Sequence, residues 1–216
     1  PGRVGTAFAA RLAESLPTRL TGRELELGDA DLVVLCVPDR VVDEVAAAVP
    51  VGPWVAHTSG ARTLDALDPH TRRFSLHPLQ TIVRHRGPAQ LDGAWAAVSG
   101  EGAEALEAGF RLASLLRLRP FALDDEDRLV YHVGAVMAQA FLVALHAAAA
   151  DLFEEAGAPP EALLPLMRRT MENDFAPTGP FVRGDRDTVA AHIGAIRARR
   201  PQLEHHLMLV PQVDAL

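Results

Sequence analysis

The chain has 216 residues, which is enough for one or two domains with a sizeable core. Apolar residues make up 49% and charged residues 23%, typical of a soluble globular protein, and a net charge of −7 with interspersed signs argues against nucleic acid or an anionic membrane as a partner. No apolar run approaches the roughly 18–20 residues that span a bilayer, and the single cysteine, Cys36, cannot form an internal disulfide, so we expect a cytoplasmic protein.

The first half alternates strand-like and helix-like segments. Apolar residues at four-residue spacing predict a helix over residues 4–16, and the continuous apolar run in DLVVLCVPD predicts a strand buried on both faces. The other expected elements are, in chain order, a short strand within 19–27, a helix at VVDEVAAAV, strands at WVAH, RFSLHP and AWAAV, a helix at GAEALEAGFRLASLL and a strand at RLRPFAL. This alternation predicts a mostly parallel α/β sheet over residues 1–123.

The second half has a helical pattern. From about Glu126 to Glu155 there is no proline and only one glycine, which predicts a helix of about thirty residues. Two or three further helices follow without a strand, so we predict an all-helical domain over residues 124–216. The loop APTGPFVRGDRDT precedes one of these helices, and we expect Asp185 or Asp187 to cap it.

The chain opens with PGRVG, directly before a helical pattern. Gly2 and Gly5 match the second and third glycines of the dinucleotide-binding pattern G-x-G-x-x-G, in which a helix N-terminus holds a pyrophosphate. The first glycine and its strand would lie before Pro1, and an ordinary turn is the alternative. Arg23, if it follows a second strand, would favour NADP over NAD.

Polar residues follow three of the expected strands. Ligands of open α/β sheets bind beyond the carboxyl ends of the strands. The three strand ends read Val37-Pro38-Asp39, His57-Thr58-Ser59-Gly60 and His77-Pro78-Leu79-Gln80-Thr81. Two of these strands end in histidine, and each histidine serves either a ligand site or the fixing of its loop.

Three polar residues recur at seven-residue spacing on the long helix. His132, Gln139 and His146 would lie near one face of an α-helix. His146 fits an interior role, whereas His132, beside Tyr131 and near the domain junction, is the better candidate for chemistry. The chain has no H-x-x-x-H pattern and no cysteine pair, and the adjacent His205-His206 would point apart on a helix, so we expect no metal site.

Several phrases occur together and in order along nearly the whole chain. They are GRVG, ADLVVLCVPD, AHTSGA, SLHPLQT, YHVGAVMAQAF and TGPFVRGD. In combination they resemble the family of Rossmann-like proteins with a C-terminal domain of unknown function, grouped with ketopantoate reductase-like and deazaflavin-dependent NADP oxidoreductase-like proteins. The chain departs from that family in lacking the first strand and first glycine, in a shortened second strand, and in having Ala138-Gln139 where the family usually has Ser-Asn.

The resemblance implies a Rossmann domain followed by a helical substrate and dimerisation domain, with NADP or NAD as cofactor, a small-molecule substrate and a homodimer. It places the cofactor at Gly2, Arg3, Val4, Gly5, Pro38, Asp39, His57, Thr58, Ser59 and Gly60, and it also matches His77, Tyr131, His132, Thr178, Arg183 and His192 to family motifs.

From these residues we predict an oxidoreductase that reduces a carbonyl or imine of a small carboxylated metabolite. Reduction needs a proton donor, for which His132 is the first choice and His77 the second, because the unperturbed pKa of histidine lies near 6.5. Gln139 would orient the substrate and Arg183, with Thr178 and His192 nearby in sequence, would hold its carboxylate. The alternatives are a dinucleotide-binding sensor or scaffold without turnover, a purely structural protein, and, among enzymes, ketopantoate reduction.

Overall fold

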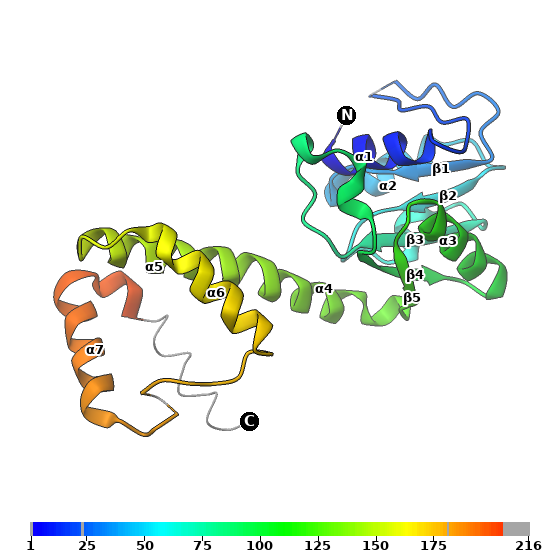
Figure 1. Cartoon of the computed structure of the whole chain (residues 1–216). Coiled ribbons are helices and arrows are strands. Elements are labelled where there is room, and N and C mark those ends of the chain that lie inside the picture. The colour runs from blue at the N-terminus through cyan, green and yellow to red at the C-terminus, as the bar shows by residue number, and fades with distance from the viewer. Residues whose placement is uncertain (1, 23, 181, 205–216) are drawn as a thin grey trace. The chain divides into compact units, whose positions relative to one another are not determined.

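The computed structural model describes residues 2–22, 24–180 and 182–204 (Figure 1). Arg23 and the pair His205-His206, which entered the predictions above, lie outside the described residues. The chain divides into two compact units, Pro1–Met137 and Ala138–Leu216. The first unit therefore contains the sheet together with the beginning of the long helix.

The first unit is built on a five-stranded sheet. Its strands are β1 (Leu32–Leu35), β2 (Trp54–His57), β3 (Arg73–Pro78), β4 (Trp95–Gly100) and β5 (Arg119–Ala122), and they lie side by side in that order. The pairs β1–β2, β2–β3 and β4–β5 are parallel and β3–β4 is antiparallel. The predicted mostly parallel α/β sheet is therefore confirmed.

The prediction of a strand within residues 19–27 is wrong. The described residues of that segment have no regular secondary structure and are mostly exposed. Its sequence, RLTGRELEL, alternates apolar with charged or polar residues as a half-buried strand would. A strand needs a neighbour to accept its backbone hydrogen bonds, and no described strand pairs with this segment.

Helices pack on both faces of the sheet. Val33 and Leu35 of β1 pack with helix α2 (Val42–Ala47), whereas Leu32 and Val34 pack with helices α1 (Arg3–Leu12) and α3 (Ala103–Leu115). This alternation follows from the two-residue repeat of a strand. Helix α3 lies close to the sheet at Gly109, where an added Cβ would overlap Val98 and lie 3.2 Å from Phe74.

The second half is helical, as predicted. Consecutive residues from Asp125 to Glu155 are helical, comprising α4 (Arg128–Val136), a π-helical turn (Met137–Phe141) and α5 (Leu142–Glu155), and they are followed by α6 (Leu163–Glu172) and α7 (Arg186–Arg199). Short 3-10 helices occur at Asp39–Val41, Leu64–Leu67, Arg84–Arg86, Pro88–Leu91, Asp125–Asp127, Pro160–Ala162 and Pro201–Leu203. The π turn lies between His132 and His146 and contains Gln139. That these three residues share one face of the helix stays a prediction.

One expectation about membranes needs correction. By length and composition, the helical run Asp125–Glu155 could cross a bilayer, since its best window has a mean hydropathy of 1.8. His132, Gln139 and His146 interrupt the apolar run, so no uninterrupted run is long enough to span a bilayer. The mean hydropathy of the helix nevertheless stays high enough for a span. Only 6% of the window is buried within this chain, so most of its apolar side chains are uncovered.

Candidate active site

The carboxyl ends of β1, β2 and β3 meet at one edge of the sheet. Leu35 pairs with His57, and His57 pairs with Ser75 two residues before His77. The start of α1 lies at the same edge, because a Cβ added to Gly2 would be 3.6 Å from the carbonyl oxygen of Cys36. Four segments that the sequence analysis singled out are therefore neighbours in the first unit.

The N-terminus of α1 is open to a ligand. Gly2 is the N-cap residue in an extended conformation, and no side chain of the described residues caps the helix. The backbone N–H groups of the first turn have no partner within a helix, so those of residues such as Arg3 and Val4 are available to an anion. Gly5 is buried, and a Cβ there would lie 3.2 Å from Cβ of Cys36, so the helix start is tightly packed on the end of β1.

The loop after β2 is held by its own side chains and by the end of β1. The N–H of Thr58 donates to the carbonyl of Leu35 (3.2 Å), and Oγ of Ser59 accepts hydrogen bonds from the N–H groups of Ala61 (3.2 Å) and Arg62 (3.0 Å). Ser59 and Gly60 are buried. The hydroxyl of Ser59 thus fixes the loop from inside.

His57 is an interior residue. Its side chain has no solvent exposure, and neither ring nitrogen has a hydrogen-bond partner of normal geometry among the described residues. The pKa of His57 is lowered to about 4, first by burial and then by the charge of Arg128, although the nearby backbone of Thr63 and the charge of Asp39 act in the opposite direction. The imidazole is therefore neutral at neutral pH and faces the core, not the surface.

Pro38 and Asp39 are exposed at the end of β1, where Asp39 begins a 3-10 helix. The charge of Asp39 partly opposes the lowering of the pKa of both His57 and His77, so all three residues belong to the same edge of the sheet. Burial raises the pKa of the Cys36 thiol to about 11, which keeps this cysteine protonated and inert. The expectation that Cys36 acts as a small apolar residue fits this environment.

A residue that the sequence analysis missed, Arg128, ties the loop to the sheet. Its guanidinium is completely buried and donates to Oγ of Ser75 (2.5 Å), Oγ of Ser99 (2.9 Å), the carbonyl of Arg62 (2.7 Å) and the carbonyl of Ser59. Arg128 is the first residue of α4, where the helix dipole disfavours a cation. That unfavourable position is the feature of the sequence that could have indicated a special role.

Three ring side chains meet above this loop. Nδ1 of His77 lies 2.8 Å from the hydroxyl of Tyr131, and the rings of His77 and His132 make an edge contact with their centres 5.6 Å apart. A Cβ on Gly60 would overlap Nδ1 of His132 and come within 2.9 Å of Nε2 of His77. Glycine is therefore needed at position 60 because both imidazoles approach the backbone there. The first two candidates for proton donor, from separate parts of the sequence, are brought together.

The protonation state of His77 differs from the sequence-based expectation. Its pKa is lowered to about 4, by burial first and then by the charges of His132 and Arg128. Burial also raises the pKa of Tyr131. At neutral pH His77 is a neutral imidazole next to a protonated phenol, so the pKa of 6.5 that motivated the choice of histidine does not apply to it.

The remaining predicted residues belong to the second unit and are exposed. Gln139 lies in the π turn, a type of helical defect that is frequent at functional sites. Thr178 precedes α7, whose N-terminus is capped by Asp185, as predicted: Oδ1 of this residue accepts from the N–H of Thr188 (3.1 Å) and Oδ2 accepts from its hydroxyl (2.8 Å). Asp185 therefore already occupies the N-terminus of α7.

Arg183 and His192 share a neighbourhood within that unit. Hydrogen bonds from Thr188 are the main cause that lowers the pKa of Asp185, and the charges of Arg183 and His192 add to the effect. A carboxylate already accompanies these two basic side chains. A substrate carboxylate would therefore compete with Asp185 for them.

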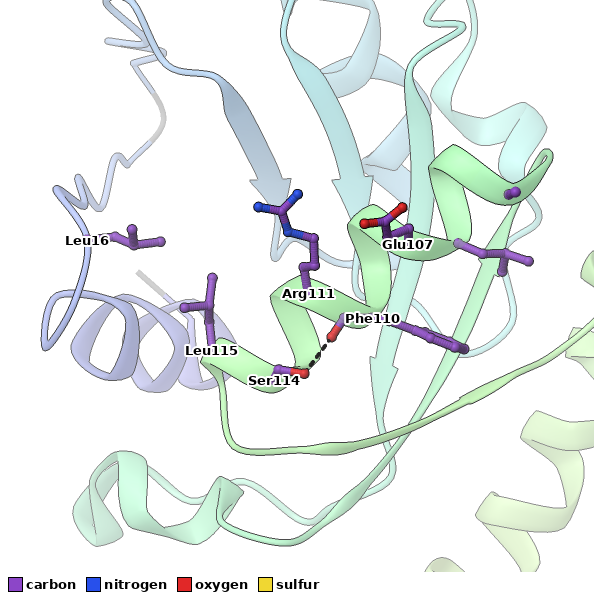
Figure 2. A pocket seen from close by; sticks show the side chains of 8 residues that line it. Leu16, Glu107, Phe110, Arg111, Ser114 and Leu115 are labelled. Carbon is purple, nitrogen blue, oxygen red and sulfur yellow. Dashed lines mark hydrogen bonds between the residues drawn. The ribbon is translucent and has the colours of Figure 1, made fainter.

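Two cavities of the first unit lie apart from these residues. One of about 840 Å³ is lined by the exposed side of α3 and by Leu16 (Figure 2). Its wall is mainly apolar, with Arg111 and Glu107 on the same helix, and the hydroxyl of Ser114 donates to the carbonyl of Phe110 (3.0 Å). A second, of about 360 Å³, is lined by Arg19, Leu20, Thr21, Gly22, Glu24 and Glu26. Neither cavity is lined by a predicted site residue.

Solved structures share this fold. A protein of Bacteroides fragilis named NADP oxidoreductase BF3122 is 22% identical, with a TM-score of 0.73 over 87% of this chain and 76% of that one. Protein TM1727 of Thermotoga maritima is 23% identical, with a TM-score of 0.68 over 86% and 79%. A 1-pyrroline-5-carboxylate reductase of Streptococcus pyogenes is 14% identical, with a TM-score of 0.62 over 98% and 94%. No curated protein matches the chain.

The sheet, its covering helices and the helical second half define a Rossmann-type fold with a C-terminal helical domain, the fold of these oxidoreductases. Residues 94–208 match the model of the domain of unknown function DUF2520. The chain belongs to that family, as the resemblance in its motifs implied. The match begins before β4, so the family domain includes the last two strands and α3 as well as the helices.

Proposed function

We propose that this protein is an NAD(P)-dependent oxidoreductase that reduces a carbonyl or imine in a small carboxylated metabolite. The observation that carries the proposal is the single sheet edge at which the uncapped start of α1, the loop after β2 and the cluster of His77, Tyr131 and His132 meet. Ligands of open α/β sheets bind at this edge. The names of two structures with the same fold, an NADP oxidoreductase and a 1-pyrroline-5-carboxylate reductase, support this reaction class.

The residues at this edge fit a dinucleotide. The free N–H groups at the start of α1 suit a pyrophosphate, and the exposed Arg3 adds positive charge. When bound, the nicotinamide would supply a hydride. The protein's own part is to give a proton to the oxygen or nitrogen that becomes negative, and His77 and His132 are placed for that step. Orienting the substrate and holding its carboxylate stay the roles predicted from the sequence for Gln139 and Arg183, which belong to the second unit.

Substitution of Gly2 tests the cofactor site. We expect NADPH or NADH to raise the melting temperature of the protein, because a ligand that binds only the folded state stabilises it. Gly2→Asp would cap α1 and put a negative charge where the pyrophosphate binds, so it should weaken NADPH binding by about tenfold or more without lowering stability. Gly2→Asn, of the same shape without the charge, is the matched control.

Each outcome of this experiment is informative. Equal NADPH affinities for the Gly2→Asp and Gly2→Asn proteins would contradict the placement of the pyrophosphate, and the absence of any shift with either nucleotide would contradict the proposed function. Binding without oxidation of NADPH across a panel of keto acids and cyclic imines would favour the sensor instead.

We further propose that a second copy of this chain covers α4 and α5. Residues 129–150 contain no Asp, Glu, Lys or Arg. The large apolar side chains exposed there are Leu129, Val130, Val133, Val136, Met137, Phe141, Leu142, Val143 and Leu145. An uncharged apolar face is complementary to itself, and a two-fold dimer places the same patch of both subunits in contact.

Sedimentation in aqueous buffer tests the dimer. We expect the mass of two chains, and we expect Val143→Lys to shift the protein toward one chain because a charge would be buried at the contact. Leu166→Lys on α6, where the side chain is similarly exposed, should leave the dimer intact. A wild-type protein that sediments as one chain, or that leaves solution with phosphatidylcholine vesicles, would contradict the proposal.

A further inference from the structure

The hydroxyl of Tyr131 is the hydrogen-bond partner of Nδ1 of His77, at 2.8 Å. Resting on the proposed function, we propose that Tyr131 is a positioning residue: its hydroxyl donates to Nδ1 of His77, fixes the tautomer protonated at Nε2, and so makes His77 Nε2–H the proton donor to the substrate. Tyr131 was matched to a family motif in the sequence, but no role was assigned to it there.

The packing around Tyr131 holds its hydroxyl in place. Its ring makes an edge contact with His77, with ring centres 5.6 Å apart, and another with Phe121 of β5, with ring centres 6.0 Å apart. Tyr131 is on α4 and Phe121 is on a strand of the same unit, so the hydroxyl is directed from a rigid element. Among the described residues, His77 is the partner of that hydroxyl.

The direction of the hydrogen bond follows from the two groups. A phenol donates readily and a neutral imidazole has one nitrogen that accepts. The raised pKa of Tyr131 keeps its proton on oxygen, and the lowered pKa of His77 leaves one ring nitrogen without a proton. The hydrogen bond at one nitrogen of an imidazole decides which nitrogen carries the proton. With Nδ1 accepting, the proton of His77 lies on Nε2.

Nε2 is the nitrogen that reaches the loop after β2. It lies near Gly60, on the side where the added Cβ would come within 2.9 Å of it, and Nδ1 of His132 approaches the same point. Nδ1 of His132 is buried, and no described residue is its hydrogen-bond partner. The charged or titratable groups that act on His77 are Arg128 and His132 from α4 and Asp39 from the end of β1. Two imidazoles therefore flank the loop that the family resemblance assigns to the cofactor.

The proton balance of the step is as follows. The Nε2–H bond of His77 breaks and its proton bonds to the substrate oxygen or nitrogen that reduction leaves negative. Because Nδ1 becomes strongly basic as Nε2 loses its proton, the hydroxyl proton of Tyr131 then moves to Nδ1. His77 stays neutral as the tautomer protonated at Nδ1, and Tyr131 becomes a phenolate. His77 is partly exposed, so a proton from solvent can then bind Nε2 while the proton on Nδ1 returns to the oxygen of Tyr131, which restores the starting tautomer. A histidine with a lowered pKa can thereby donate without first becoming an imidazolium.

Long-range 1H–15N NMR of histidine-labelled protein tests the tautomer without any substrate. We expect the His77 signals, identified by their loss in His77→Gln, to show protonation at Nε2 in the wild-type protein at neutral pH. In Tyr131→Phe the ring contacts remain but the donor is lost, so the signals should move toward a mixture of tautomers. Phe121→Leu, which removes a ring contact and leaves the hydroxyl, should retain the wild-type pattern.

The possible results separate this inference from the proposed function. A wild-type His77 protonated at Nδ1 would overturn the inference, whether or not Tyr131→Phe folds. An unchanged tautomer in folded Tyr131→Phe would also overturn it, since the hydroxyl would then not be the cause. The binding of NADPH is measured separately: its absence contradicts the proposed function, whereas the tautomer result stands on the protein alone.

Discussion

Replacement of Arg128 by methionine should lower the free energy of unfolding by about 2–4 kcal/mol. The guanidinium donates to the hydroxyls of Ser75 and Ser99 and to the carbonyls of Ser59 and Arg62, all from a completely buried position. Methionine leaves two buried carbonyls without donors, at about 1–3 kcal/mol each. Part of this cost is offset because a buried charge is also removed. Urea denaturation at neutral pH measures the change.

Two variants sharpen this prediction. Arg111→Met removes an exposed arginine from α3 of the same unit and should change stability by no more than about 0.5 kcal/mol. Arg128→Lys keeps the charge but lacks the planar fork that reaches four acceptors, so it should recover little of the loss. If Arg128→Met is as stable as the wild-type protein, the four hydrogen bonds do not hold the loop after β2.

The architecture of the first unit could be predicted because its strands are buried on both faces. The continuous apolar run LVVL of β1 is typical of a buried parallel strand, and the predicted run DLVVLCVPD contains it. The segment RFSLHP, predicted as a strand, is β3. The segment 19–27 was mispredicted because alternation of apolar and polar residues indicates a strand only where a neighbouring strand exists to pair with it. Pairing is a tertiary property that the local pattern does not contain.

The candidate site was predicted only in part, for a similar reason. His77 lies at a strand end and His132 near the start of a helix, so topology could place each of them. Arg128 follows the acidic run DDED, and such a residue is normally solvated. Its burial depends on serine hydroxyls and loop carbonyls from three other segments, which no spacing within the sequence brings together. For the same reason, the burial that makes His57 and His77 neutral was not foreseen.

Acid should destabilise the fold between about pH 6.5 and pH 4 because of His57. Its pKa is about 4 in the folded protein and 6.5 as the ordinary value, so in this interval the unfolded chain binds a proton and the folded protein does not. Stability therefore falls as the pH falls, by on the order of 3 kcal/mol for a shift of this size. His77 has the same sign, whereas above pH 6.5 neither residue contributes.

Urea denaturation across this pH interval, in the wild-type protein and two variants, isolates the contribution of His57. His57→Leu fills the same interior position without a titrating group, so its stability should depend less steeply on pH than that of the wild-type protein. His85→Leu removes an exposed histidine from the same unit and should keep the wild-type dependence. Parallel curves for the wild-type protein and His57→Leu would mean that His57 has the same pKa in the folded and the unfolded protein. The neutral state of the imidazoles at this edge of the sheet, on which the role of His77 depends, would then need another explanation.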